Sequence, residues 1–352
     1  MKTIAVFVKN LTSGGAEKQS VLLAKALSRD YDVYYIIFNE AKVHKKYLEQ
    51  LAEEGSIHIK SFKGNLLVRL TSLIVYLKRS PISTIFSYLT AANLYACMAG
   101  KMLGIKVFTG LRNAELPVLK CFVDRILTNY FAEAAISNSF SGKENFVRRG
   151  FKKEKIVVIP NSYEDIKPYS PKQDAAEIHI ITVGRFVRQK DYKTAIKSIS
   201  LLRKSSVKIH YDIVGYGELQ SQIEHWIDES HIRDITSVYI NPDYIAELLD
   251  KSHIYLSTSL FEGTSNSIME AMNADLPIVA TNVGDNNRLV INGYNGILCP
   301  IADSRNIAKA IELLICNPAR RIEMGRNSKE LLQERYSVSI YKERYEKLLK
   351  SS

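Results

Sequence analysis

Short apolar runs alternate with helix-length segments along most of the chain, and this alternation limits what it can fold into. The first run is Thr3–Val8, and the next helical stretch is Ala16–Ser28. Strands that alternate with helical segments of about 10–15 residues predict βαβ units and a parallel sheet. The sequence therefore predicts an α/β protein.

The alternation is interrupted once, which predicts two domains. Residues 166–177 contain prolines, serines and charges without apolar periodicity, as expected of an interdomain linker. We expect one Rossmann-like domain at 1–165, a second at 178–336 and a final helix at 337–352. The 352 residues suffice for a core in each domain. The carboxyl ends of the strands of two such domains are expected to line a central cleft.

Composition and cysteine spacing exclude several classes of protein. Hydrophobic residues make up 46% and charged residues 24%, a balance typical of globular chains. The four cysteines lie far apart and form no C-x-x-C pair, so neither a disulfide framework nor a zinc site is expected. Reduced thiols, a short N-terminal apolar run and no stretch of about 18 apolar residues predict a cytoplasmic protein without a spanning helix.

The charge of the chain is concentrated in its first half. Residues 1–170 hold 25 Lys and Arg against 14 Asp and Glu, whereas residues 171–352 hold 23 of each. No acidic residue occurs between Gly55 and Ala114. This asymmetry suggests an anionic partner for the first domain, or else a basic face that is only solvated.

A glycine pair follows the first expected strand. Gly14 and Gly15 would let the backbone approach a ligand, and the helix that begins there offers free N–H groups to an anion. The segment is not G-x-G-x-x-G, which disfavours a dehydrogenase. A tight strand-to-helix turn, with Glu17 placed to suit the helix dipole, is the alternative.

Two cations follow the first strand of the second domain. Arg185 comes after Gly184, and Lys190 stands five residues later. An Arg fork and a Lys point charge suit a diphosphate, although solvated surface cations are the alternative. A second glycine turn at Gly215 and Gly217 carries little weight alone.

Two glutamates eight residues apart form the most informative motif. Glu262 is expected in a loop and Glu270 in the first turns of the next helix, which suits a site for sugar hydroxyls beside phosphate. Ser267 and Glu270 also have the spacing of a helix capping box. That alternative explains neither Glu262 nor the small polar residues Gly263, Thr264, Ser265 and Asn266.

The order and spacing of these motifs resemble the retaining glycosyltransferases of family 4, which have the GT-B fold of two Rossmann-like domains. The similarity runs the length of the chain. It includes Gly14–Glu17, Ser137–Ser139, Val158–Asn161, Val183–Arg185 with Lys190, Val214–Leu219 and the Glu262–Glu270 pair.

The resemblance implies roles for the motif residues. Arg185 and Lys190 would hold the donor diphosphate in place of a metal ion, Glu270 the ribose and Glu262 the transferred sugar. UDP is the nucleotide that the family habitually uses, and GDP stays open as the alternative. The glycines would shape the donor site, and the final helix would cross back to the first domain. The implied donor-binding residues are Gly14, Gly15, Gly184, Gly215, Gly263, Thr264, Ser265, Asn266 and Glu270.

The sequence also departs from the family pattern. Many members carry a His or an acidic motif after the strand that corresponds to Ile105–Thr109, where this chain has Arg112 nearby. No catalytic His is transferred, and Arg112 is a candidate for the acceptor side only. Arg288 stands where many members have a Glu, which leaves the donor contacts there open.

In this fold the first domain receives the acceptor, so its basic character suggests a lipid-linked one. Basic residues flank the apolar segment Leu66–Leu77, as in helices that lie on anionic membranes. We therefore hypothesise a polyprenyl-diphosphate glycan of surface polysaccharide assembly as acceptor; a core helix with solvated ends is the alternative. The residues concerned are Lys60, Lys63, Arg69, Lys78 and Arg79.

Other functions remain open from sequence alone. A sugar-phosphate synthase of the same fold would use a soluble acceptor and need no basic apolar patch. A degenerate nucleotide-sugar binder is disfavoured because Arg185, Lys190, Glu262 and Glu270 are all present. A nucleic-acid binder is disfavoured because no aromatic-basic module is recognisable.

Overall fold

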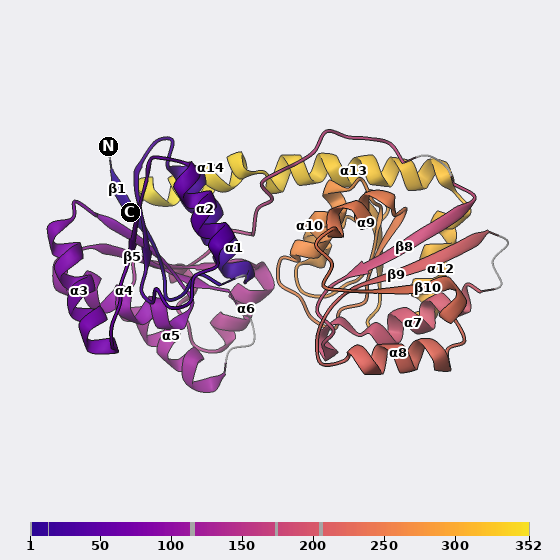
Figure 1. Cartoon of the computed structure of the whole chain (residues 1–352), viewed down its shortest axis with the longest axis horizontal. Coiled ribbons are helices and arrows are strands. Elements are labelled where there is room, and N and C mark those ends of the chain that lie inside the picture. The colour runs from indigo at the N-terminus through magenta and orange to yellow at the C-terminus, as the bar shows by residue number, and fades with distance from the viewer. Residues whose placement is uncertain (1, 13, 113–116, 173–174, 204–206, 352) are drawn as a thin grey trace. The chain divides into compact units, whose positions relative to one another are not determined.

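The computed structural model describes residues 2–12, 14–112, 117–172, 175–203 and 207–351 (Figure 1). The chain divides into two compact units. Unit one comprises Met1–Glu164 and Val338–Ser352, and unit two comprises Asp165–Ser337. Near Arg112 the sequence departs from the family pattern, and the residues that follow it, Asn113–Glu115, lie outside the described part of the chain.

Unit one is built on a seven-stranded sheet in the order β3-β2-β1-β4-β5-β6-β7, with parallel pairing throughout. Every residue of β1 is buried, as expected when helices cover both faces of a parallel sheet. The strands are β1 (Thr3–Val8), β2 (Asp32–Ile37), β3 (Ile57–Ser61), β4 (Thr84–Tyr88), β5 (Lys106–Leu111), β6 (Ala134–Ser137) and β7 (Ile156–Val158).

Successive β1 residues enter different cores because side chains of a strand alternate between its faces. Val6 packs with residues of α1, α2 and α14, whereas Phe7 packs with residues of α3, α4 and α5. The helices are α1 (Gly15–Leu27), α2 (Lys45–Glu53), α3 (Leu66–Arg79), α4 (Thr90–Leu103), α5 (Val118–Tyr130), α6 (Phe140–Arg148), the 3-10 turn η1 (Lys153–Lys155) and α14 (Val338–Ser351).

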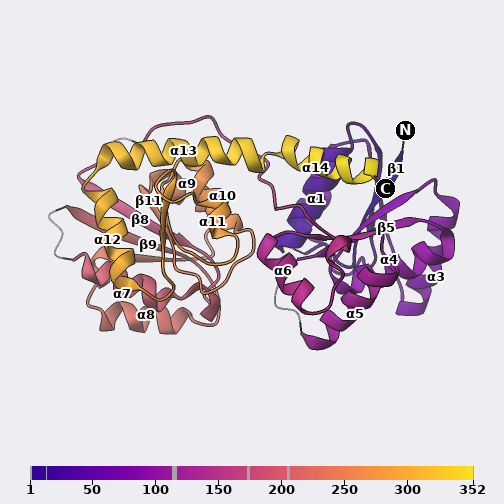
Figure 2. The ribbon, with the colours of Figure 1, turned by 180° about the vertical axis from the view of Figure 1, so that it is seen from behind.

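Unit two contains a six-stranded parallel sheet in the order β10-β9-β8-β11-β12-β13. One core lies under α7, α8 and α12, and α7 lies beside α12 (Figure 2). The strands are β8 (Glu177–Val183), β9 (Lys208–Gly215), β10 (Thr236–Ile240), β11 (Ile254–Ser257), β12 (Ile278–Thr281) and β13 (Gly296–Cys299). The helices are η2 (Arg188–Lys190), α7 (Tyr192–Leu201), α8 (Gln220–Glu229), η3 (Arg233–Ile235), α9 (Ile245–Lys251), α10 (Asn266–Asn273), α11 (Asn286–Leu289), α12 (Ser304–Ile315) and α13 (Pro318–Tyr336).

The two sheets share one topology. Numbered within each unit, the first six strands run 3-2-1-4-5-6, the order of the dinucleotide-binding Rossmann fold. The predicted fold class, α/β with two Rossmann-like parallel-sheet domains, is confirmed. In such sheets ligands bind at the carboxyl ends of the strands, where the strand order reverses. That switch point lies between β1 and β4 in unit one and between β8 and β11 in unit two.

A histidine and a buried aspartate link the two strands that lead to one of these edges. His179 on β8 lies 3.0 Å, Nδ1 to Oδ2, from Asp212 on β9. The hydrogen bond to Asp212 raises the pKa of His179, and partial burial opposes it. A raised pKa in the folded state stabilises unit two below the unfolded pKa of about 6.5, and this stabilisation is lost as pH rises through the folded pKa.

We expect His179→Gln to lower the free energy of unfolding of unit two at about pH 5.5 and to have less effect at about pH 9, because the wild-type imidazole is then neutral in both states. Urea denaturation can be followed by the fluorescence of Trp226, the one tryptophan of the chain, which lies on α8. An effect of equal size at both pH values would contradict this account.

Candidate functional site

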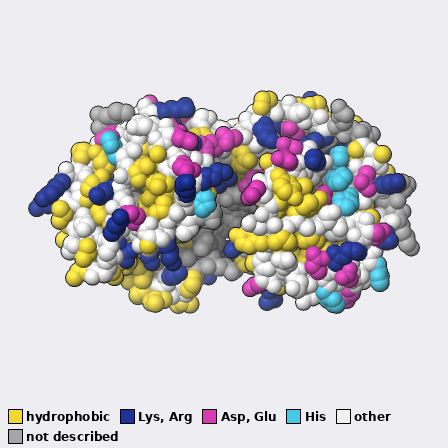
Figure 3. Space-filling view, in the orientation of Figure 1, with side chains coloured by type: hydrophobic (Ala, Val, Ile, Leu, Met, Phe, Trp, Pro, Cys, Tyr) yellow, Lys and Arg dark blue, Asp and Glu magenta, His cyan; other side chains and the backbone are white. Residues whose placement is uncertain are grey.

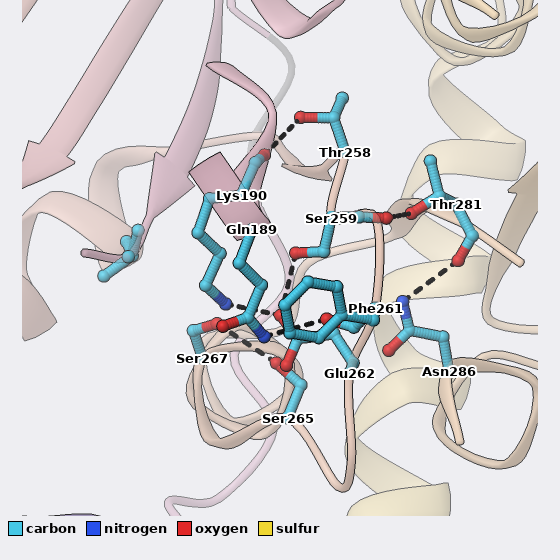
Figure 4. A network of polar contacts seen from close by, with 12 residues as sticks. Gln189, Lys190, Thr258, Ser259, Phe261, Glu262, Ser265, Ser267, Thr281 and Asn286 are labelled. Carbon is cyan, nitrogen blue, oxygen red and sulfur yellow. Dashed lines mark hydrogen bonds and ion pairs between the residues drawn. The ribbon is translucent and has the colours of Figure 1, made fainter. Parts of the chain in front are cut away.

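Polar side chains gather at the switch point of unit two. Lys190, in the turn η2 after β8, lies 2.6 Å, Nζ to Oε1, from Glu262, which follows β11 (Figure 4). The same carboxylate oxygen accepts a hydrogen bond of 2.7 Å from the Ser259 hydroxyl. The Lys190 and Glu262 side chains are only 16% and 9% exposed. The structure thus brings together two residues that the sequence separates by 72 positions.

Backbone contacts hold the two loops in register. The Gln189 side chain donates to the Phe261 carbonyl at 2.8 Å, and the Leu260 N–H donates to the Gln189 carbonyl at 2.8 Å. The Thr258 hydroxyl donates to the Lys190 carbonyl at 2.9 Å. These bonds fix the ion pair from both sides, so the site is preorganised rather than formed by mobile side chains.

Glu270 stands in the second turn of α10, half-buried. The helix begins at Asn266 with Ser265 as its N-cap, and Ser265 makes no side-chain capping bond. The capping-box interpretation of Ser267 and Glu270 is therefore wrong, because Ser267 lies inside the helix. The position of Glu270 needs another explanation than helix capping.

Tyr255 is buried in the vicinity of both glutamates. Its hydroxyl donates to the Val183 carbonyl at 3.2 Å. Burial raises the pKa of Tyr255, and the Glu270 and Glu262 carboxylates raise it further.

Two glycines allow the loops of this site to touch. A Cβ on Gly215 would lie 1.9 Å from the carbonyl oxygen of Gly184, and one on Gly284 would lie 1.8 Å from that of Glu262. Gly284 also has a φ of +52°, which disfavours other residues. Gly215, predicted to contact the donor, thus permits the close approach of the Gly184 loop.

The other predicted donor-binding residues surround the pair. Arg185 is exposed, and within the described parts of the chain its guanidinium makes no hydrogen bond or ion pair. Gly263 and Asn266 are half-buried, while Thr264 and Ser265 are buried. The Ser265 hydroxyl lies 3.2 Å from the Ser267 hydroxyl (Figure 4).

A cavity of about 310 Å³ lies at the switch point of unit one. Leu89, in its wall, has a φ of +72°, a backbone strain of about 1–3 kcal/mol for a residue other than glycine. Such strain occurs preferentially at functional sites. The cavity is lined by Val8, Lys9, Asn10, Ala16, Glu17, Tyr88, Leu89, Thr90, Ala91 and Lys120.

Glu17 supplies a carboxylate to this cavity. It is 9% exposed and accepts a hydrogen bond of 2.9 Å from the Thr12 hydroxyl. A Cβ on Gly14 would lie 2.4 Å from Glu17 Oε2, so the carboxylate folds back over Gly14 at the start of α1. The helix dipole favours a negative charge there. The sequence pattern alone does not reveal the cavity, because its lining residues come from four separated segments.

Arg112, the candidate for the acceptor side, turns toward the last helix of unit one. Its guanidinium stacks over the Tyr88 ring at 4.6 Å and donates to the Tyr345 hydroxyl at 3.3 Å and to Asn161 Oδ1 at 3.2 Å. These contacts tie β4, β5 and α14 together. Arg112 borders the cavity through Tyr88, which is one of the lining residues.

We expect Lys190→Met to destabilise unit two by about 1–3 kcal/mol, because the Glu262 side chain, only 9% exposed, would lose its cation. Adding Glu262→Gln should restore part of the loss. The measurement is urea denaturation monitored by Trp226 fluorescence. As a control, Arg203→Met removes an exposed ion pair with Asp234 and should cost less than about 1 kcal/mol. Equal losses in both variants, or no recovery in the double variant, would contradict a preorganised pair.

Comparison with known proteins identifies the family. Residues 151–331 match the family model of the glycosyl transferases group 1. An uncharacterized glycosyltransferase of Haemophilus influenzae is 26% identical, with 99% of this chain and 100% of that protein covered. A Campylobacter jejuni enzyme named as an undecaprenol-diphosphate-linked glycan α-1,4-N-acetyl-D-galactosaminyltransferase is 24% identical over 99% of this chain and 98% of that protein.

Solved structures share the fold. HepE from Anabaena, in complex with UDP, superposes with a TM-score of 0.84 at 18% identity, covering 100% of both chains. The apo lipopolysaccharide outer core galactosyltransferase WaaB superposes with a TM-score of 0.80 at 18% identity, covering 100% of this chain and 99% of that one. With the family model matched over more than half of its length, the chain belongs to the glycosyl transferases group 1 and is a glycosyltransferase of GT-B architecture.

Proposed function

We propose that the protein is a retaining glycosyltransferase of family 4 that moves a sugar from a UDP-sugar to a glycan or a lipid-linked glycan in surface polysaccharide or glycoconjugate biosynthesis. The observation that carries the proposal is the Lys190–Glu262 pair beside Glu270 at the switch point of unit two. Carboxylates for sugar and ribose hydroxyls there adjoin cations for a diphosphate.

The donor would contact both the cations and the carboxylates of this site. Lys190 and the exposed Arg185 would neutralise the diphosphate, so we propose that no metal ion is needed. Glu262, already held by Ser259, would accept hydrogen bonds from the transferred sugar, and Glu270 would bind the ribose. The choice of UDP is supported by HepE, which has been solved with UDP and with UDP-glucose.

The acceptor would bind in the cavity of unit one. Glu17 can accept hydrogen bonds from sugar hydroxyls, while Lys9 and Lys120 can attract an anionic group such as a diphosphate. The name of the Campylobacter jejuni relative includes a PP-undecaprenol acceptor, which supports a polyprenyl-diphosphate-linked glycan here. The alternative is a soluble acceptor, as in a sugar-phosphate synthase. The UDP-release assay with lipid-linked and soluble acceptors distinguishes the two.

A lipid-linked acceptor implies work at the cytoplasmic face of a membrane. Within the described residues no helix is long and apolar enough to cross a bilayer. The proposal therefore includes peripheral contact with an anionic leaflet, for which the sequence analysis nominated Lys60, Lys63, Arg69, Lys78 and Arg79.

The donor site predicts a nucleotide-dependent thermal shift. UDP at about 100 times its dissociation constant should stabilise the protein by about 2.7 kcal/mol, and Glu270→Ala should abolish most of the shift because it removes the ribose contact. Differential scanning fluorimetry with UDP, GDP, ADP and NAD tests this. The exposed Glu312→Ala on α12 is the control and should respond as wild type. A thermal shift with NAD alone, or no thermal shift with any of the four nucleotides, would contradict the proposal.

The acceptor cavity predicts a different phenotype for Glu17→Gln. Loss of its charge should lower kcat/KM for the acceptor by about 10–100-fold while leaving the UDP thermal shift unchanged, because a hydrogen bond to a charged group is worth about 1.5–3 kcal/mol. The assay is UDP release stimulated by undecaprenyl-diphosphate-linked N-acetylgalactosamine. Equal stimulation of variant and wild type would remove Glu17 from the acceptor site, and stimulation only by soluble sugar phosphates would favour a synthase.

A further inference from the structure

Three consecutive helices of unit one, α3, α4 and α5, present large apolar side chains to solvent. Val118 and Leu119 at the start of α5 are 88% and 75% exposed, and Met102 at the end of α4 is 65% exposed. Within the described part of unit one, exposed large hydrophobic residues occur on these helices or directly after α5, and not on α1, α2, α6 or α14. They are Leu66, Leu67, Val68, Val75, Leu94, Met98, Met102, Val118, Leu119, Phe122, Tyr130 and Phe131.

These side chains belong to one continuous surface, here called the α3–α5 surface. The helix α4 packs against α3 on one side and against α5 on the other, and the three cover the same core. Figure 3 shows yellow side chains interspersed with blue ones over this part of unit one, including its lower edge where α5 lies. Apolar exposure of this extent on one face of a protein marks an interaction site.

The exposed charges within the helices α3, α4 and α5 have one sign. Lys78, Arg79, Lys101 and Lys120 are exposed. The one acidic residue within these three helices is Asp124, which is 2% exposed. Thr90 and Asn93 donate to its carboxylate at 2.6 Å and 2.9 Å.

The structure extends the set of cations that the sequence nominated for contact with a membrane. Lys60 lies over the Phe62 and Tyr76 rings, Arg69 lies over the Phe38 ring, and Lys63 pairs with Glu40 at 3.1 Å. Lys60 and Lys63 remain exposed despite these contacts, as do Lys78 and Arg79 at the end of α3. The structure adds the exposed Lys101 of α4 and Lys120 of α5 to this set. The two most exposed apolar side chains, Val118 and Leu119, lie on α5.

We propose that the α3–α5 surface docks on an anionic lipid bilayer, with Met98, Met102, Val118 and Leu119 below the headgroups and the lysines against the phosphates. Apolar side chains ringed by basic ones are the pattern of interfacial membrane binding. The biological use of this surface rests on the proposed function, since it would bring the enzyme to a lipid-linked acceptor.

Two properties of the surface favour a bilayer over other occupants. A helix needs roughly 20 residues to span the core of a bilayer, and α3 and α4 have 14 residues each. The contact with a bilayer would therefore be interfacial. A second copy of the chain joined through the same face would set basic residues against basic residues, since a two-fold interface pairs identical patches. Anionic headgroups instead complement the charge.

The test is flotation of the full-length protein with vesicles of phosphatidylcholine alone or with about 30% phosphatidylglycerol, at physiological and at high salt. Wild type should bind the anionic vesicles at least about 10-fold better than the neutral ones at physiological salt. The variant Val118→Ser with Leu119→Ser should lose binding at both salt concentrations. Lys78→Gln with Lys101→Gln should reduce it mainly on anionic vesicles.

The matched control is Leu201→Ser with Leu313→Ser, which removes two side chains of unit two that are 48% and 43% exposed and should leave flotation unchanged. Failure of wild type to float with anionic vesicles, or equal losses in the control, would overturn the docking proposal. So would a wild-type dimer, seen by sedimentation, that the α5 variant dissociates. The UDP thermal shift is measured on the same samples: if it persists while flotation fails, docking alone is wrong, and if it is absent, the proposed function is wrong.

Discussion

Parallel strand pairing in the order 3-2-1-4-5-6 is the constraint on which both candidate sites depend. It makes β1 and β4 neighbours in one unit and β8 and β11 neighbours in the other, with their carboxyl ends side by side. Loops that are far apart in the sequence leave the sheet at the same place. Buried strands hold these loops rigidly, so polar side chains on them converge without an ordering cost at the time of binding.

The two sites arrange their charged side chains differently on these equivalent sheets. In unit two a carboxylate is paired with a cation, and the pair is fixed by Ser259 and by backbone contacts between the loops. In unit one the Glu17 carboxylate lies over a helix start, with Lys9 and Lys120 in the same cavity wall. A nucleotide-sugar presents both hydroxyls and a diphosphate, so paired opposite charges suit it. A glycan on a diphosphate anchor needs the same combination.

The sequence predicts the fold, because buried parallel strands are continuous apolar runs. The glutamate pair has an informative spacing, and the donor roles of the motif residues stay predictions. The sequence misses β3 (Ile57–Ser61), an edge strand whose IHIKS pattern alternates with polar residues. The final helix, expected at 337–352, is α14 (Val338–Ser351). It is separated from α13 by Ser337, the residue that ends α13.

Side-chain direction is the part of the sites that sequence could not supply. In the sequence, Lys60 and Arg69 flank or interrupt the apolar segment that is predicted to lie on a membrane. In the structure, Lys60 lies on β3 over the Phe62 ring, and Arg69 lies over the Phe38 ring. The sequence nominated Arg112 for the acceptor side without naming a contact, and the structure stacks the Arg112 guanidinium on Tyr88, a residue of the cavity wall. Such contacts depend on tertiary neighbours from distant segments, which no local pattern contains.

The most direct test of the central claim, that the Lys190–Glu262 pair acts on a nucleotide-sugar donor, is the rate of UDP release from a panel of UDP-sugars by wild type, Lys190→Ala and Glu262→Gln. The account predicts release from at least one UDP-sugar and a loss of about 10²–10³ in rate in Lys190→Ala, since a group that stabilises the leaving diphosphate is removed. Release that is equally fast in wild type and both variants would show that the chemistry occurs elsewhere.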